Sequence, residues 1–288
     1  MSFSLGLPWV SNGRTTVSGL ISKVIPFSCV DGPGNRFVIF LQGCNFNCKN
    51  CHNPQTINFC NHCGDCVEQC PSEALSLNDG KISWNSRQCE SCDQCLDICP
   101  VNSSPMVEEK TVEELLQQIR VASPFIDGIT LSGGEATVQL KFVKAFFTAV
   151  KNDSALNHLT CLIDSNGYLP LSAWKSVLPV MDGAMIDLKA MDADLHKWLT
   201  GRDNFRVFQT IEYLASVSKL IEVRLLIIPN INDTAEEKMA VKDYLSSLNT
   251  NINIKVNAFS NKAVKGEAID WLSLSEEKKA LYLQSINR

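Results

Sequence analysis

Three cysteines in the segment GCNFNCKNCHNP, residues 43–54, have a spacing that can hold a metal centre with one open position. Cys44, Cys48 and Cys51 follow the pattern C-x3-C-x2-C. A structural metal site is closed by four protein ligands, whereas a catalytic site keeps one position free for a substrate. Eight more cysteines follow before residue 100, so cysteine is not scarce where the fourth ligand is missing. We predict that the three thiolates bind three irons of a four-iron cluster and leave the fourth iron open.

Two runs of four cysteines form an internal repeat directly after this segment. CNHCGDCVEQCP (60–71) and CESCDQCLDICP (89–100) share the pattern C-x2-C-x2-C-x3-C-P. In two-cluster ferredoxins this spacing holds two four-iron clusters, and the fourth cysteine of each run binds the other cluster. Two structural zinc sites are the alternative. The predicted ligand sets are Cys60, Cys63, Cys66 and Cys99 for one cluster, and Cys89, Cys92, Cys95 and Cys70 for the other.

Composition and charge limit the remaining function classes. The chain has 288 residues, an apolar content of 45% and a net charge of -5, so it has no basic surface that favours nucleic acid or an anionic membrane. No apolar run approaches the roughly 18 residues of a spanning helix, and residues 1–20 lack the features of a secretory signal. Eleven of the 13 cysteines are crowded between Cys44 and Cys99, which indicates metal binding in a reducing, cytoplasmic environment. Cys29 and Cys161 stand apart, and we expect both to be structural.

Apolar runs that alternate with helical patterns predict an α/β fold. The helical patterns begin at Thr111, which forms a capping box with Glu114, and continue at 137–151, 171–178, 192–217, 234–248 and from about 275. The largely apolar runs are typical of parallel strands buried on both faces. They lie at 36–41, 128–134, 158–167, 183–189, 221–229 and 251–259.

Six such units predict a partial (β/α)6 barrel formed by residues 21–54 and 108–288, with an open doubly wound sheet as the alternative. Residues 55–107 would be an inserted ferredoxin-like domain with a hairpin that turns at Asp79-Gly80. Residues 1–20 would be a poorly ordered N-terminal extension.

Polar residues cluster where the predicted strands end. They are Ser132-Gly133-Gly134-Glu135, Asp164-Ser165-Asn166-Gly167, Asp187 and Lys189. Ligands bind at this edge in α/β barrels and sheets. We therefore expect these residues to lie around the cysteine segment.

The cysteine motif followed by Gly133-Gly134-Glu135 resembles the radical S-adenosylmethionine superfamily. In that family the amino acid moiety of the cofactor binds the open iron through its nitrogen and carboxylate. The resemblance implies that the three cysteines of C-x3-C-x2-C form the catalytic centre. It also implies that Gly133 and Gly134 let the backbone approach the methionine group, and that Glu135 accepts a hydrogen bond from its ammonium.

Further segments are similar to the activating enzymes of glycyl radical enzymes, which are relatives of the activase of pyruvate formate-lyase. The similarity covers the chain from about residue 20, and the added cysteine runs resemble the longer, YjjW-type subgroup. The matching segments are DGPGNRFVIFLQGCNFNCKNCHNP, GGEAT, DSNG, MIDLK, LTGRDN and VRLLIIP.

This resemblance implies a monovalent cation near the cofactor carboxylate, and oxygen ligands suit such a hard cation. Its ligands would come from Asp164, Ser165, Met185 and Asp187. Lys189 would contact the cofactor directly.

Other positions are expected near the adenosine group or elsewhere on the cofactor. Arg224 is expected to point towards the cofactor, with a structural ion pair as the alternative. Asn50 stands where many members have an aromatic residue against the adenine, and Ser260 stands where one has a histidine near the ribose. Ala136 replaces a proline that some members have after GGE.

The implied function is the activation of a partner protein. S-adenosylmethionine would be cleaved reductively, and the 5′-deoxyadenosyl radical would take hydrogen from a backbone glycine of a glycyl radical enzyme. The implied cofactors are three [4Fe-4S] clusters and S-adenosylmethionine, and flavodoxin or ferredoxin would donate the electron. The alternatives are a radical enzyme that acts on a small metabolite and a ferredoxin-like electron-transfer protein.

Overall fold

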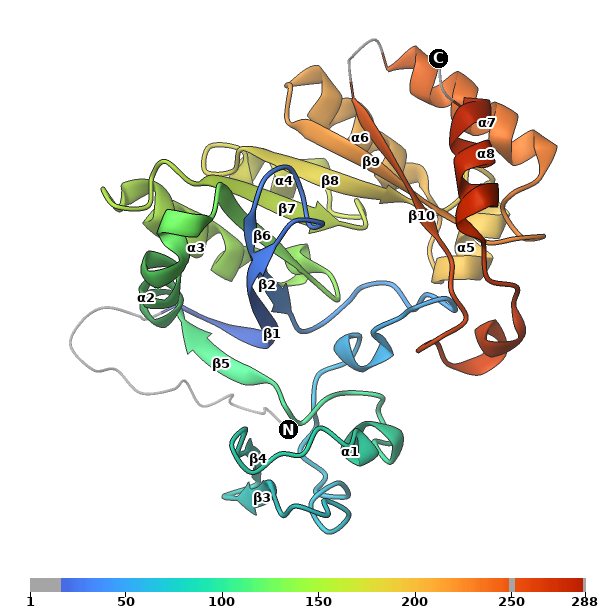
Figure 1. Cartoon of the computed structure of the whole chain (residues 1–288). Helices are drawn as coiled ribbons and strands as arrows, with labels where there is room; N and C mark the ends of the chain where they lie inside the picture. The colour runs from blue at the N-terminus through green and yellow to red at the C-terminus, as the bar shows by residue number, and fades with distance from the viewer. Residues whose placement is uncertain (1–16, 249–251, 287–288) are drawn as a thin grey trace, which may run out of the picture.

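One open sheet organises the protein, and the computed structural model describes residues 17–248 and 252–286 (Figure 1). Within those residues, eight strands pair in the order β10-β9-β8-β7-β6-β2-β1-β5. The six from β2 to β10 are mutually parallel, while β1 is antiparallel to both β2 and β5. The strands are β1 (Ser18–Ser28), β2 (Arg36–Leu41), β5 (Glu108–Thr111), β6 (Gly128–Gly133), β7 (Thr160–Ser165), β8 (Gly183–Leu188), β9 (Leu220–Ile227) and β10 (Asn253–Ala258).

The predicted strands and helices are confirmed, and the order of the strands decides how they are wound. In this sheet the parallel strands follow one another in chain order without a reversal. A doubly wound sheet would reverse its strand order at a switch point. Right-handed crossovers in a single direction place every connecting helix on the same face. The doubly wound alternative is therefore wrong. The helices are α2 (Val112–Ala122), α3 (Leu140–Asn152), α4 (Leu171–Val177), α5 (Ala193–Thr200), α6 (Phe205–Ser216), α7 (Ala235–Ser247) and α8 (Glu276–Ile286).

Two strands of the sheet, β1 and β5, were not expected from the sequence. β1 is irregular, since its register with β2 shifts between Ile21 and Lys23 and again between Ile25 and Ser28. These bulges and Pro26 break the alternation that would have revealed a strand. β1 begins at Ser18, so residues 18–20 of the predicted N-terminal extension belong to the sheet, while residues 1–16 lie outside the described residues.

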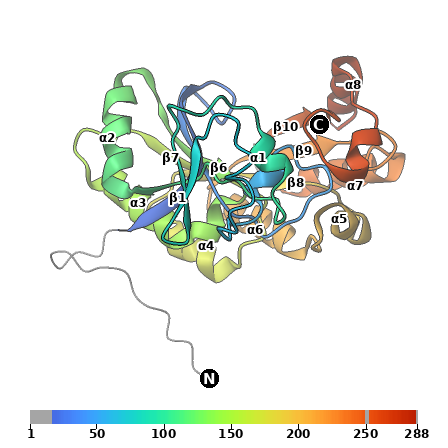
Figure 2. The same cartoon turned by 90° about the horizontal axis from the view of Figure 1, so that it is seen from below.

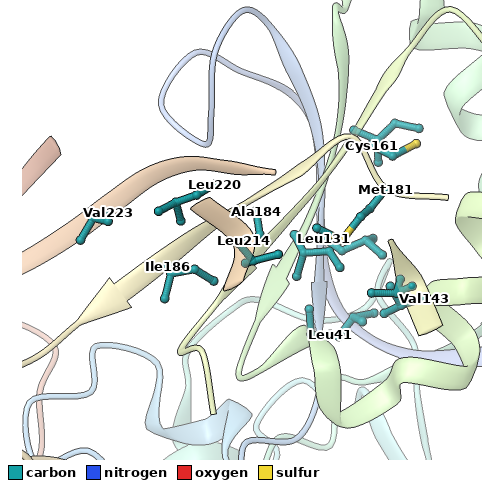
Figure 3. Packing of buried hydrophobic residues seen from close by; sticks show 14 of the residues in the cluster. Leu41, Leu131, Val143, Cys161, Met181, Ala184, Ile186, Leu214, Leu220 and Val223 are labelled. Atoms are coloured by element: carbon teal, nitrogen blue, oxygen red, sulfur yellow. The ribbon is translucent and has the colours of Figure 1, made fainter. Parts of the chain in front are cut away.

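The strands bury different side chains on their two faces. On the face that packs against the helices, alternate residues such as Ile129, Leu131 and Ile163 are fully buried in one apolar core. Figure 3 shows part of this core, where Leu41 and Leu131 lie near Val143 of α3. Cys161 is buried in the same core, as predicted.

The opposite face, which we term the inner face, carries polar and charged side chains. Because strand side chains alternate, the neighbours of the core residues point there. They include Thr130, Ser132, Asp164, Asp187 and Arg224. The expectation of strands that are apolar on both faces is wrong for this side, which is the side that positions the site.

The cysteine-rich segment forms a separate lobe below the sheet (Figures 1 and 2). It contains a short helix, α1 (Gln94–Asp97), and a hairpin of β3 (Leu75–Asn78) and β4 (Lys81–Trp84). The hairpin turns at Asp79-Gly80 as predicted, and both residues have positive φ, at 49° and 72°.

The lobe is tied to the end of β2 by Gln42. Its buried amide nitrogen Nε2 donates to the carbonyls of Gln55 and Asn58, at 2.8 and 2.6 Å. The Asn58 side chain in turn donates to the carbonyl of Val101 at 2.9 Å. The two chain segments that enter and leave the lobe are thereby held together. No helix in the described part of the chain has the length and apolar character needed to cross a bilayer.

The capping box at the start of α2 gives a testable prediction. The Thr111 hydroxyl accepts from the Glu114 N–H at 3.3 Å, and the Glu114 carboxylate accepts from the Thr111 N–H at 2.7 Å. Thr111→Ala removes one half of this pair and should lower the free energy of unfolding by about 1 kcal/mol. Urea unfolding under anaerobic, reducing conditions measures this, with Thr111→Ser as the control that keeps the hydroxyl. Equal stability of the alanine variant and the wild type would contradict the capping role.

Candidate metal and cofactor site

A cavity of about 370 Å³ opens at the carboxyl ends of the parallel strands. Small-molecule pockets have roughly 300–1,000 Å³, so this cavity is near the lower end of that range. Residues far apart in sequence line it together, as the strand-end argument predicted. The predicted site residues that line it are Cys44, Cys48, Asn50, Cys51, Gly133, Gly134, Glu135, Asp164, Ser165, Asp187, Lys189 and Arg224.

The cysteine segment is held in the cavity by its own backbone. The Gly43 N–H donates to the Thr56 carbonyl at 2.8 Å, which closes the segment on itself. The N–H groups of Asn47 and Lys49 donate to the last carbonyls of α5, those of Thr200 and Leu199, at 2.9 Å each. These carbonyls have no partner within a helix. The segment therefore uses a helix end as its anchor, and its cysteines are left free to face the cavity.

The three thiols are in a strongly desolvated position. Burial raises the pKa of Cys44 and of Cys48 to about 12, and it also raises the pKa of Cys51. Thiolates at such a place need a nearby positive charge, and bound irons supply it. Three thiols that line one cavity match the three protein ligands of a four-iron cluster with one open iron.

Gly133 and Gly134 are required by the cysteine segment itself. Gly133 has a φ of +121°, and a Cβ atom there would meet the backbone of Leu41. A Cβ atom on Gly134 would meet the carbonyl oxygens of Gly43 and Thr56. The Gly134 and Glu135 N–H groups donate to the carbonyls of Leu41 and Gly43 at 3.0 and 2.8 Å. The two glycines therefore let the backbone of the cysteine segment lie against the end of β6.

Glu135 joins the ends of β6 and β7. Its side chain is 1% exposed, and burial raises its pKa. One carboxylate oxygen accepts from the Thr137 N–H and from the Ser165 hydroxyl, at 2.9 Å each. The other accepts from the Asn166 N–H at 2.7 Å. With several internal donors on its carboxylate, Glu135 has a clear structural task besides the expected contact with an ammonium.

Two buried cations, Arg224 and Lys189, form three ion pairs on the inner face. Arg224 contacts Asp164 at 2.9 Å and Glu222 at 2.6 Å, and Lys189 contacts Asp187 at 2.8 Å. Burial raises the pKa of Asp164 to about 6, although the adjacent Arg224 acts in the opposite direction. Burial lowers the pKa of Lys189, but Asp187 and Cys48 together outweigh it, so its pKa is raised. Both cations stay charged beside the thiols, where an anionic group of a ligand would be attracted.

The residues expected to hold a monovalent cation come together only in part. Asp164 and Asp187 line the cavity, but their carboxylates already bind Arg224 and Lys189. The Ser165 hydroxyl donates to Glu135, and the backbone of Met185 in β8 pairs with that of Asp164 in β7. The predicted ligands are neighbours on these two strands, but both carboxylates already hold a cationic side chain, so the binding of a further cation stays a prediction.

Arg224 and Met185 are in direct contact. The Arg224 Nη2 lies 3.0 Å from the Met185 sulfur, because both side chains point to the inner face from neighbouring strands. Arg224 thus forms the ion pairs of the structural alternative, and it also lines the cavity in which a cofactor contact was expected.

The expected adenosine contacts differ in outcome. Asn50 is 4% exposed and lines the cavity. Ser260 does not line it, and its carbonyl oxygen lies 2.8 Å from Nε2 of His52. His52, which directly follows Cys51, lines the cavity instead. Ala136, at the start of a 3-10 helix, is fully buried.

Two further polar residues of the strand-end motifs, Ser132 and Asn166, line the cavity as expected, but their hydrogen-bond partners were not predicted. The Ser132 hydroxyl donates to Asp164 at 2.9 Å, and the Asn166 side chain donates to Asn45 of the cysteine segment at 2.7 Å. Both residues lie in the strand-end motifs, and the alternation of side chains along each strand indicates which of them face the inner side of the sheet. Their partners, however, come from other strands and loops.

The lobe contains two smaller hollows, each bordered by four cysteines. We term them the Cys99 hollow and the Cys70 hollow. Cysteines of both runs contribute to each, in the crossed arrangement that the spacing predicted. They are Cys60, Cys63, Cys66 and Cys99 for the first, and Cys70, Cys89, Cys92 and Cys95 for the second.

The contact between Gly134 and the cysteine segment gives a prediction. Gly134→Ala should displace the carbonyls of Gly43 and Thr56, so the C-x3-C-x2-C segment should lose its cluster. The iron content of anaerobically reconstituted protein should fall by about four per chain. Ser172→Ala, at an exposed position of α4 outside the site, is the control and should leave the iron content unchanged. Unchanged iron content in the Gly134 variant would refute the packing argument.

Comparison with known proteins agrees with this geometry. Residues 38–241 match the model of the radical SAM superfamily. The 4-hydroxyphenylacetate decarboxylase activating enzyme of Clostridioides difficile (strain CD196) is 31% identical over 92% of this chain and 88% of its own. The (2S)-3-sulfopropanediol dehydratase activating enzyme of Klebsiella oxytoca is 29% identical over 90% of this chain and 84% of its own.

Among solved structures, Streptococcus suis SuiB bound to the precursor peptide SuiA aligns with a TM-score of 0.55 at 14% identity. The alignment covers 86% of this chain and 44% of that one, and it shows a shared fold alone. The family model and the two activating enzymes establish more than the fold. The chain belongs to the radical SAM superfamily and, within it, to the activating enzymes of glycyl radical enzymes.

Proposed function

We propose that this protein activates a glycyl radical enzyme by reductive cleavage of S-adenosylmethionine. When bound, a [4Fe-4S] cluster supplies one electron to the sulfonium, so that the bond between sulfur and the 5′ carbon breaks and methionine and a 5′-deoxyadenosyl radical result. The radical then takes a hydrogen atom from a backbone glycine of the partner protein. The relatives named above are activating enzymes of this kind.

One observation carries the proposal: three buried thiols and two side chains that keep their positive charge line the same cavity. Cys44, Cys48 and Cys51 would hold the cluster, and Lys189 and Arg224 line the same cavity. An amino acid moiety bound at an open iron presents a carboxylate, which these two side chains would attract and orient. No protein base is needed for the step, so orientation and exclusion of water are the tasks of the chain.

The open sheet supports a macromolecular substrate. β10 and β5 are the ends of the sheet, and no described strand closes the gap between them. We propose that the six parallel strands form a partial (β/α)6 barrel, whose mouth admits an extended loop of a partner protein. The cytoplasm, where thiols stay reduced, is the proposed location.

The opening loop at Asp31-Gly32-Pro33-Gly34 lies at the other end of the strands. It precedes β2, whereas the cavity lies after the strands end. The Thr130 hydroxyl donates to the Asp31 carbonyl at 2.8 Å, and a Cβ atom on Gly32 would contact Leu162 and Met185. This loop covers the floor of the inner face. An entering peptide would meet the opposite side.

We further propose two ferredoxin-type [4Fe-4S] clusters in the lobe, one in the Cys99 hollow and one in the Cys70 hollow. Each hollow is bordered by thiols of both runs, which supports the crossed pairing of two-cluster ferredoxins.

The lobe would then form an electron path from a flavodoxin or ferredoxin to the radical centre. Cys44 donates its N–H to the Ile57 carbonyl at 2.9 Å, and the Phe59 ring, next to Cys60, packs against Gly43. The chain that leads from the cysteine segment to Cys60, the first cysteine of the Cys99 hollow, is thus packed against the cysteine segment. Cys66 raises the pKa of Cys95, although burial is the larger cause, so the two hollows are also neighbours.

Electron paramagnetic resonance tests the main proposal. Anaerobically reconstituted protein, reduced and mixed with S-adenosylmethionine and a candidate glycyl radical enzyme, should give a glycyl radical doublet and 5′-deoxyadenosine. Cys48→Ala, which removes one cluster ligand, is the control and should give neither. 5′-deoxyadenosine without any glycyl radical across candidate partners would favour an enzyme that acts on a small metabolite.

The electron path is tested by removing one ligand from each hollow. Cys63→Ala with Cys92→Ala should leave binding of S-adenosylmethionine intact and should reduce turnover with flavodoxin or ferredoxin to background. Turnover with dithionite should remain, because a small reductant reaches the site cavity directly. Undiminished turnover with the protein donor would rule out the path.

A further inference from the structure

Trp84 has a buried donor without a partner. It is the last residue of β4 and pairs with Leu75 across the hairpin. Its indole Nε1 is buried and makes no hydrogen bond within the described structure. The Trp84 side chain lines the Cys70 hollow, together with Cys70, Cys89, Cys92 and Cys95.

An indole nitrogen can only donate a hydrogen bond. A buried N–H group without an acceptor carries an uncompensated desolvation penalty, so such groups are uncommon in folded proteins. Where one borders a hollow bordered by four thiols, a sulfur atom in that hollow is the natural acceptor. Sulfur atoms of iron–sulfur clusters accept hydrogen bonds from protein N–H groups, and these bonds influence the reduction potential.

The Cys99 hollow lacks this donor. Ile82 lines it, and Ile82 lies two residues before Trp84 in β4. Residues two apart in a strand point to the same face. One face of β4 therefore presents an apolar side chain to one hollow and an indole N–H to the other.

The thiol of Cys70 has further donors around it. The Ser72 hydroxyl lies 3.7 Å from its sulfur. The Ser91 N–H donates to the sulfur of Cys89, which borders the same hollow, at 3.4 Å. Donors to sulfur are thus already present around the Cys70 hollow.

We infer that Trp84 donates a hydrogen bond to a sulfur atom of the cluster in the Cys70 hollow and makes that cluster easier to reduce than the one in the Cys99 hollow. Reduction adds negative charge to the cluster, so the hydrogen bond is stronger in the reduced state. Trp84 is then a tuning residue that helps the outer cluster to accept an electron. This inference rests on the two clusters proposed for the lobe.

Trp84→Phe tests the inference, because it removes the N–H and keeps an aromatic ring. Redox titration of the complete, reconstituted protein, followed by electron paramagnetic resonance, measures each cluster. The reduction equilibrium constant of one ferredoxin-type cluster should fall about tenfold, which is 59 mV for one electron. The other should be unchanged. Trp198→Phe, a matched exchange outside the lobe, should alter neither.

A second variant separates the N–H from the shape of the ring. Benzothienylalanine at position 84 keeps a bicyclic ring and replaces N–H by sulfur, so it should lower the same potential even if the phenylalanine variant loses its cluster. Pulsed resonance of the reduced native protein should show an exchangeable proton coupled to this cluster, and the benzothienylalanine variant should lack it.

The outcomes distinguish the levels of the proposal. Two ferredoxin-type clusters with unchanged potentials in both variants would overturn the role of Trp84 and leave the electron path standing. About four irons per chain in the native protein would overturn the lobe clusters, and Trp84 with them. Neither result affects the glycyl radical test.

Discussion

The contact between the cysteine segment and the end of β6 is the constraint on which the rest of the site depends. Gly134 has no side chain, so the carbonyls of Gly43 and Thr56 can lie directly against it, and Gly133 likewise leaves room for the backbone of Leu41 at the end of β2. Glu135 then turns inward, and its buried carboxylate binds the N–H and hydroxyl groups at the end of β7. The close approach of two backbones therefore sets the position of the three thiols relative to the strands. A side chain at either glycine would separate the cluster ligands from the cofactor-binding edge.

The inner face of the sheet supplies the electrostatics of the site. Strand alternation buries one set of side chains under the helices and leaves the other set, with Asp164, Asp187, Lys189 and Arg224 near the strand ends, facing the cavity. Each cation is held by a carboxylate, so it stays charged despite burial. The pairs also fix the side chains in place before a ligand binds, which lowers the entropic penalty of orienting it.

The lobe differs from the rest of the protein in what can stabilise it. It has little apolar core, and a short hairpin and one turn of helix are its regular elements. Its eight cysteines surround two hollows, so bound clusters would supply the stability that a core normally gives. The hairpin also shapes the two hollows, because β4 places the apolar side chain of Ile82 beside one hollow and the indole of Trp84 beside the other.

The sequence by itself predicted the parallel strands and the helices, and it placed the C-x3-C-x2-C cysteines beside the strand ends, where the cavity lies. The crossed pairing of the two cysteine runs stays a prediction from their spacing. Strand and helix patterns, capping boxes and cysteine motifs depend on residues that lie close together in the sequence. They can therefore be recognised without knowledge of the fold. Only the tertiary structure revealed β1, whose bulges hide its alternation, and the winding that places all connecting helices on one face. It also decided that His52 rather than the side chain of Ser260 lines the cavity, and that Asp164 and Asp187 are bound by Arg224 and Lys189. The partners of a buried charge come from other strands, and no local pattern records which side chains the fold brings within hydrogen-bonding distance.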